Sequence, residues 1–222
     1  MHPDFLVVGA ILRAASLFQF KKMLNFARTF LNNRFSSKLS SVKEAILPHA
    51  AEAILLGRGW NLGTILKRAF YELARRDSLC STDDSSCGSS SDDDDDDDDT
   101  HSDSDGDDYD AIQQLDSKDL IRLANGQKKL MSAWLSAVQL GGVKCTLKTP
   151  CSSNKGHSIW AIISPHLTEY QFDPICGIEY LMNNVEWKTM GHCVQCADAR
   201  VTSLKKQREQ IWENMSIWFD LK

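Results

Sequence analysis

The chain has 222 residues, of which 42% are hydrophobic and 9% aromatic, which is enough for one sizeable core or two small ones. A short peptide and a wholly disordered protein are therefore excluded. No apolar run approaches the roughly 18 residues of a membrane helix, so we expect neither a membrane span nor a membrane partner. Seven Cys are too few for a disulfide scaffold, and no basic segment precedes the first apolar stretch as in a signal peptide. The expected location is the cytoplasm or the nucleus.

The net charge of −5 hides a segregated pattern. Residues 77–117 contain 17 Asp and no Lys or Arg, whereas the net charge is +8 over residues 1–76 and +4 over residues 118–222. Two basic parts are thus joined by a strongly acidic one. The sequence predicts a mostly α-helical protein in which two helical modules, at 1–76 and 115–222, are joined by a disordered acidic linker at 77–114.

The first module has apolar residues at helical spacing, without the period-two alternation of a half-buried strand. A third helix is expected to begin at Pro48 and a fourth to have Thr64 as its N-cap. Two apolar stripes on the first two helices are predicted to face the core: Val7, Ile11, Ala14, Phe18 and Met23, Phe26, Phe30.

The acidic linker is predicted to be disordered because it has almost no large apolar side chain besides Tyr109. Ordering about thirty residues costs at least ~30 kcal/mol, and burying one aromatic ring returns only about 2 to 3. The eight consecutive Asp of 92–99 repel one another and extend the chain. The alternatives to a plain spacer are phosphorylation of its serines and masking of the basic modules.

The second module is predicted to open with a helix that has Ser117 as its N-cap and Gly126 as an interruption. Asp173 and Pro174 are expected to open a later helix. The final helix is the clearest element, because an apolar stripe repeats at three and four residues and only Arg208 interrupts it. Burial within this module is favoured over pairing as a coiled coil. The stripe consists of Val194, Ala197, Val201, Leu204, Arg208, Ile211, Met215 and Trp218.

Several segments, taken in their order, resemble the BTB/POZ-domain proteins of mushroom-forming fungi. In the first module they are Ile11-Leu12-Arg13-Ala14-Ala15, Leu17-Phe18-Gln19-Phe20, Ala53-Ile54-Leu55-Leu56-Gly57-Arg58 and Arg68-Ala69-Phe70-Tyr71-Glu72-Leu73-Ala74-Arg75. In the second they are Asp119-Leu120-Ile121, Asp173-Pro174, Gly191-His192-Cys193-Val194-Gln195-Cys196, Ile211-Trp212-Glu213 and Trp218-Phe219.

The resemblance implies that residues 5–35 correspond to the closing helices of a BTB domain and 41–76 to its helical extension. The strand-rich half that forms most of the BTB dimer surface has no counterpart before Phe5, so the chain looks truncated and dimerisation is uncertain. The resemblance implies protein–protein interaction, with an adaptor for a ubiquitin ligase as one form of it.

Four of the Cys form two pairs, with five residues inside the first pair, two inside the second and 41 between the pairs. Four thiolates can hold one tetrahedral zinc at about 2.3 Å, and the second pair precedes a helix whose dipole favours thiolate. The sequence predicts a structural zinc site at Cys145, Cys151, Cys193 and Cys196.

Other interpretations of these residues stay open. His192 or His157 can replace a Cys ligand, the thiols can be unrelated, or Cys193 and Cys196 can form a redox pair.

The predicted function is non-enzymatic protein–protein interaction, with no catalytic residues and no cofactor other than zinc. No Gly-rich phosphate loop, Gly-x-Ser-x-Gly or His-Glu-x-x-His motif occurs. The alternative is a nucleic-acid-associated protein with a zinc-stabilised C-terminal module and an autoinhibitory acidic tract. That alternative is based on Lys205, Lys206 and Arg208 of the last helix, although Glu209 and Glu213 follow them.

Overall fold

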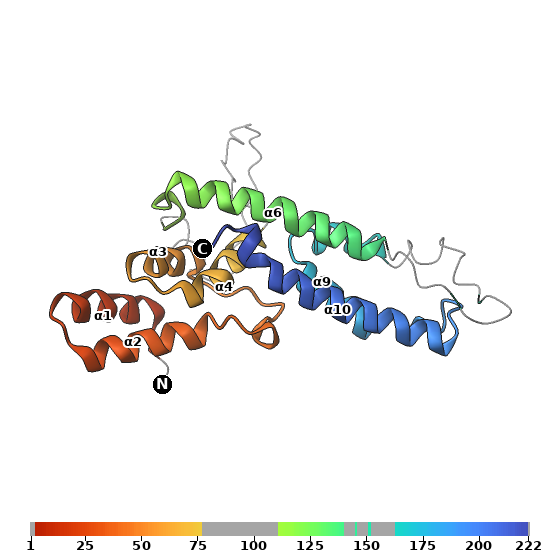
Figure 1. Cartoon of the computed structure of the whole chain (residues 1–222), viewed down its shortest axis with the longest axis horizontal. Helices are drawn as coiled ribbons and strands as arrows, with labels where there is room; N and C mark the ends of the chain where they lie inside the picture. Colours follow the sequence, from red (N-terminus) through yellow and green to blue (C-terminus); the bar gives the residue numbers. More distant parts are fainter. Residues whose placement is uncertain (1–2, 77–110, 140–144, 146–150, 152–162, 222) are drawn as a thin grey trace, which may run out of the picture.

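The computed structural model describes residues 3–76, 111–139, 145, 151 and 163–221. Within these ranges all regular structure is helical, which confirms the mostly α prediction (Figure 1). The predicted acidic linker lies outside the described residues as far as residue 110. None of the helices in the described ranges is long and apolar enough to cross a membrane. The helices are α1 (Phe5–Leu17), α2 (Lys21–Arg34), η1 (Leu39–Ser41), α3 (Ala50–Gly59), α4 (Gly63–Ala74), α6 (Ser117–Val138), α8 (His166–Glu169), α9 (Pro174–Asn184) and α10 (Val194–Trp218).

The predicted core stripes of α1 and α2 are wrong by one residue, because a neighbouring face, turned by about 100°, is the buried one; of the predicted stripes only Ile11 and Phe30 pack partly against the core. On α1 the buried residues are Phe5, Val8, Gly9, Leu12 and Ala15, and on α2 they are Ala27 and Leu31. Val7, Phe18, Met23 and Phe26 are exposed instead. Both faces of α1 are apolar at helical spacing, so periodicity could not choose between them.

Two helix starts in this module also differ from prediction. Helix α3 begins at Ala50 after His49, which has a left-handed backbone with φ 63°, so Pro48 lies outside it. Helix α4 has Leu62 as its N-cap. The Thr64 hydroxyl is instead 2.6 Å from Asn32 Oδ1, and this hydrogen bond ties α4 to α2.

The two predicted modules pack against each other through α4. Its Phe70 ring lies 5.5 Å from that of Phe219, and its Tyr71 ring meets Trp212 edge-on at 5.5 Å. The Trp212 indole also donates to the Ser37 carbonyl at 2.8 Å. Nearly every side chain of α4 from Ile65 onward is buried, which makes this helix the centre of one continuous core.

A buried network of charges also joins the modules. Glu72, with 0% exposure, accepts from Arg68 at 2.5 Å and pairs with Arg75 at 2.8 Å. Arg75 reaches Asp173 of the second module at 2.8 Å, and the Tyr71 hydroxyl donates to the same carboxylate. Burial and the charge of Asp173 raise the pKa of Tyr71 well above its usual value, so this hydroxyl stays a donor.

Helix α6 starts one residue earlier than predicted and is not interrupted. Asp116 is its N-cap and accepts from the Asp119 amide at 2.6 Å. Gly126 lies inside the helix, where a Cβ atom would stand 1.9 Å from Cε1 of Phe219. This glycine permits the close approach of α6 to the C-terminal end of α10.

Asp173 and Pro174 open α9 as predicted, with the Asp173 carboxylate accepting from the Cys176 amide at 3.1 Å. Helix α10 is also confirmed, and α6 and α10 run in opposite directions along the long axis of the molecule (Figure 1). Arg208 does not disturb the apolar stripe of α10, because its guanidinium turns to α9. It pairs there with Glu179 at 2.7 Å and donates to the Ile175 carbonyl at 3.0 Å.

Candidate metal centre

The second cysteine pair is positioned by a tight turn before α10. Gly191 has φ 84°, a conformation that favours glycine, and the His192 amide then donates to the Trp187 carbonyl at 3.2 Å. Cys193 follows as the N-cap of α10, and Cys196 lies in its first turn. Thiolates at these positions face the positive end of the helix dipole.

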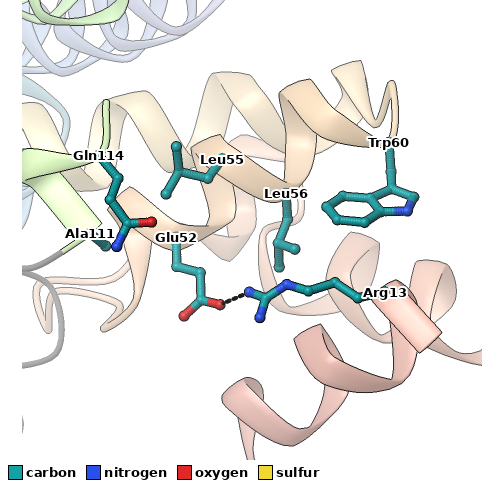
Figure 2. Close-up of a pocket in the computed structure, with 7 residues that line it drawn as sticks. All are labelled: Arg13, Glu52, Leu55, Leu56, Trp60, Ala111 and Gln114. Atoms are coloured by element: carbon teal, nitrogen blue, oxygen red, sulfur yellow. Dashed lines mark hydrogen bonds and ion pairs between the residues drawn. The ribbon is translucent and has the colours of Figure 1, made fainter. Parts of the chain in front are cut away.

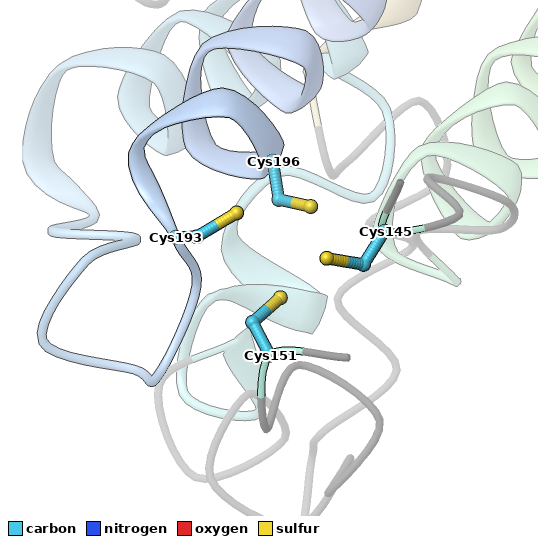
Figure 3. Close-up of side chains that lie close together, drawn as sticks. All are labelled: Cys145, Cys151, Cys193 and Cys196. Carbon is cyan, nitrogen blue, oxygen red and sulfur yellow. The ribbon is translucent and has the colours of Figure 1, made fainter. Parts of the chain in front are cut away.

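All four predicted ligands come together (Figure 3). The sulfur atoms of Cys145, Cys151, Cys193 and Cys196 lie within 4.8 Å of one another. In a tetrahedral zinc–thiolate site with bonds of about 2.3 Å, neighbouring sulfurs are about 3.8 Å apart. A small inward movement of the side chains would therefore complete the site. Cys196 is buried and the other three are partly exposed, so an ion has a route of entry.

The thiols interact strongly even without an ion. The hydrogen bond with Cys193, burial, and the neighbouring Cys145 and Cys151 together raise the pKa of Cys196 to about 12. Its proton must leave when a metal binds, as is general for thiolate ligands. The arrangement thus offers four soft donors close to one point, and four thiolates are the donor set of structural zinc rather than of magnesium or calcium.

A buried arginine beside the cluster would balance its charge. Arg200 follows Cys196 by one helical turn and is only 7% exposed, with its guanidinium 5.3 Å from the centre of the Trp187 ring. Burial lowers the pKa of Arg200, whereas the charge of Cys196 raises it. Four thiolates and Zn²⁺ carry a net charge of −2, so a fixed cation here favours the loaded site.

His192 does not join the group of ligands. Its ring is buried edge-on against Trp187 at 5.8 Å, and neither ring nitrogen has a hydrogen-bond partner among the described residues. Burial, and then the charge of Arg200, lower the pKa of His192. His157, the other predicted alternative ligand, lies outside the described residues.

A hollow of about 450 Å³ lies between α1, α3 and the segment before α6 (Figure 2). Leu55, Leu56 and Trp60 form apolar walls, and the charges of Arg13 and Glu52 bind each other at 2.6 Å. The two charges of the hollow thus satisfy each other.

Sequence reasoning missed the residues that support the centre. Trp187 carries no motif, and the only signal for Arg200 is its position four residues after Cys196 on the predicted final helix. The buried charges of α4 had a weak signal, since Arg68, Glu72 and Arg75 repeat at four and three residues on an otherwise apolar helix.

Comparison of the chain with protein-family models finds no match, and comparisons with curated proteins and with solved structures find none either.

Proposed function

We propose that the chain is a non-catalytic protein-interaction module whose second half is held together by a structural zinc ion. The convergence of four cysteine sulfurs within 4.8 Å supports the zinc site. The cysteines come from the connection after α6 and from the start of α10. Zinc would therefore link the ends of these two helices and hold them side by side.

The outer face of α6 is the surface that we propose for a protein partner. Ile121 is 61% exposed, Leu135 is 45% exposed, and Met131 lies between them at helical spacing. Helix α6 has 22 residues and carries this apolar stripe away from its contacts with α4, α9 and α10. An exposed stripe of this length suits an amphipathic partner helix.

The zinc site is tested by counting metal ions in the protein purified under reducing conditions. We expect one zinc per chain, its loss in Cys196→Ser, and its retention in Cys176→Ala, whose thiol belongs to α9. Chelation should lower the melting temperature of the wild-type protein. A zinc-to-protein ratio near zero, with melting unchanged by chelation, would remove the zinc site from the proposal.

The interaction surface is tested with Met131→Asp/Leu135→Asp, and with Ile46→Asp as a control of similar exposure. A protein captured by the wild-type chain is purified, recombined with it, and mapped by hydrogen exchange. We expect protection of α6 and loss of binding in the double variant alone. Equal binding by all three chains would exclude the α6 face.

Non-catalytic binding is also the function that the BTB/POZ resemblance implies, and a ubiquitin-ligase adaptor stays a prediction. The alternative nucleic-acid role receives less support from the packing of α10. Lys205 and Lys206 are exposed, but Arg208, the third member of the predicted basic cluster, pairs with Glu179.

A further inference from the structure

The turn between α1 and α2 presents large apolar side chains to solvent. Leu17 is 77% exposed, Phe18 is 63% exposed and Phe20 is 61% exposed. The two phenylalanine rings stack with their centres 5.9 Å apart, and Met23, in the first turn of α2, is also exposed. The turn lies at one end of the molecule, opposite the end where α6 and α10 meet the cysteine cluster (Figure 1).

This exposure is not required by the turn itself. The Phe20 amide donates to the Ala15 carbonyl, and the Gln19 amide donates to that of Ser16, which is the Schellman pattern for ending a helix. Helix α3 ends in the same pattern, but its corresponding residue, Leu62, is only 7% exposed. In such motifs this residue usually packs on its own helix, whereas here an aromatic ring projects outward.

The turn also departs from the residue choices that stabilise helices. Gln19 has φ 57°, a conformation that glycine adopts at lower cost. Phe20 is the N-cap of α2 and supplies no side-chain hydrogen bond, and Lys21 and Lys22 place positive charge at the positive end of the helix dipole. Local departures of this kind are expected where a segment serves binding rather than stability.

The charge around the turn has one sign. From Phe5 to Lys43 the chain contains seven Lys or Arg and no Asp or Glu. Lys21 and Lys22 are exposed next to the aromatic rings, and no ion pair is found for them among the described residues. The surface is therefore complementary to a binding partner that offers both negatively charged and apolar groups.

We propose that this turn docks into the interface of an anionic lipid bilayer. Phe18, Phe20 and Leu17 would enter the boundary between headgroups and acyl chains, while Lys21 and Lys22 would meet lipid phosphates and carboxylates. A bilayer fits better than a partner helix because the exposed apolar side chains gather at the end of a helical hairpin and not along the face of one helix. This inference departs from the sequence-based expectation that no membrane is a partner, and it does not depend on the α6 surface.

The test is co-sedimentation of the full chain with vesicles of phosphatidylcholine, with and without phosphatidylserine. We expect binding only to the anionic vesicles. Phe18→Ser/Phe20→Ser should weaken it by at least about tenfold, and Lys21→Gln/Lys22→Gln by roughly fivefold per lysine. Ile217→Ser and Lys205→Gln/Lys206→Gln alter equally exposed residues elsewhere and should leave binding unchanged.

Depth of insertion is tested by placing a tryptophan at the turn with Phe20→Trp. Brominated lipids should quench the tryptophan fluorescence of this variant more than that of the wild-type protein. Unchanged circular dichroism would confirm that the variants are folded. The proposal is overturned if no vesicle binds, if the turn variants bind as the wild type does, or if added quenching is absent. It is also overturned if the turn proves to be covered by a second copy, by the chain's own acidic segment, or by another protein.

Discussion

Replacing Gly126 by alanine should destabilise the protein, although alanine is the better helix former. Gly126 lies in the interior of α6, where the substitution alone would stabilise the helix by about 1 kcal/mol. The new Cβ atom would, however, lie 1.9 Å from Cε1 and 2.3 Å from Cδ1 of Phe219. The Phe219 ring is fully buried beside Phe70 and cannot swing into solvent.

Overpacking of this kind costs typically 1 to 3 kcal/mol, and a clash with a whole ring belongs at or above the upper end of that range. The net loss is therefore about 2 kcal/mol, and for a chain of this size the melting temperature should fall by roughly 4 to 8 °C. The assay is thermal and urea unfolding of the wild type and of Gly126→Ala, with circular dichroism as the measure of the folded fraction.

Gly59→Ala is the matched control, because a Cβ atom at this helical glycine meets nothing within 4 Å. It should leave stability unchanged or raise it slightly. Phe219→Leu, combined with Gly126→Ala, should recover part of the loss, since the smaller side chain can yield. If Gly126→Ala melts at or above the wild-type temperature, the close packing of α6 on the C-terminal end of α10 is refuted.

Three further substitutions test other parts of the structure. Glu72→Ala should cost about 3 to 5 kcal/mol in urea unfolding, because it leaves the charges of Arg68 and Arg75 buried without their partner. A loss below 1 kcal/mol would mean that this network is hydrated. Arg200→Met should weaken zinc binding about tenfold in competition with a chelator, because it removes the cation beside Cys196. Equal affinity would assign Arg200 to packing alone. Gln19→Gly should raise stability by roughly 0.5 to 1 kcal/mol, because glycine adopts φ 57° without strain. A loss of stability would show that the Gln19 side chain has a structural role.

The elements most accurately predicted from the sequence are those with strong local signals. Asp173 and Pro174 supply a carboxylate cap and a fixed φ at the start of α9, and both act through backbone atoms a few residues away. The long stripe of α10 specifies a helix over 25 residues. The cysteine prediction also succeeded in its geometry, because Cys193 and Cys196 are close enough in sequence to reach one point from a helix start.

Predictions failed where the local sequence was equally compatible with two structures. Helix α1 has apolar residues on two faces, and the side that became buried was decided by which face meets α2 and α3. Val7 and Phe18 were assigned to the core for this reason, although they are exposed. Gly126 was predicted to interrupt the helix. Its actual role is to leave space for the Phe219 ring, and that residue lies 93 positions further along the chain.

Composition and periodicity were sufficient for the helical class, for the segregation of acidic residues between two basic parts, and for the four cysteines as a candidate zinc site. These properties depend on residue types and short-range spacing. Tertiary packing alone decided that α4 would join both halves in one core, that Arg200 would be buried against Trp187, and that the aromatic turn after α1 would be exposed. Each of those outcomes depends on contacts between distant segments of the chain. The free energies of these contacts cannot be inferred from a local sequence pattern.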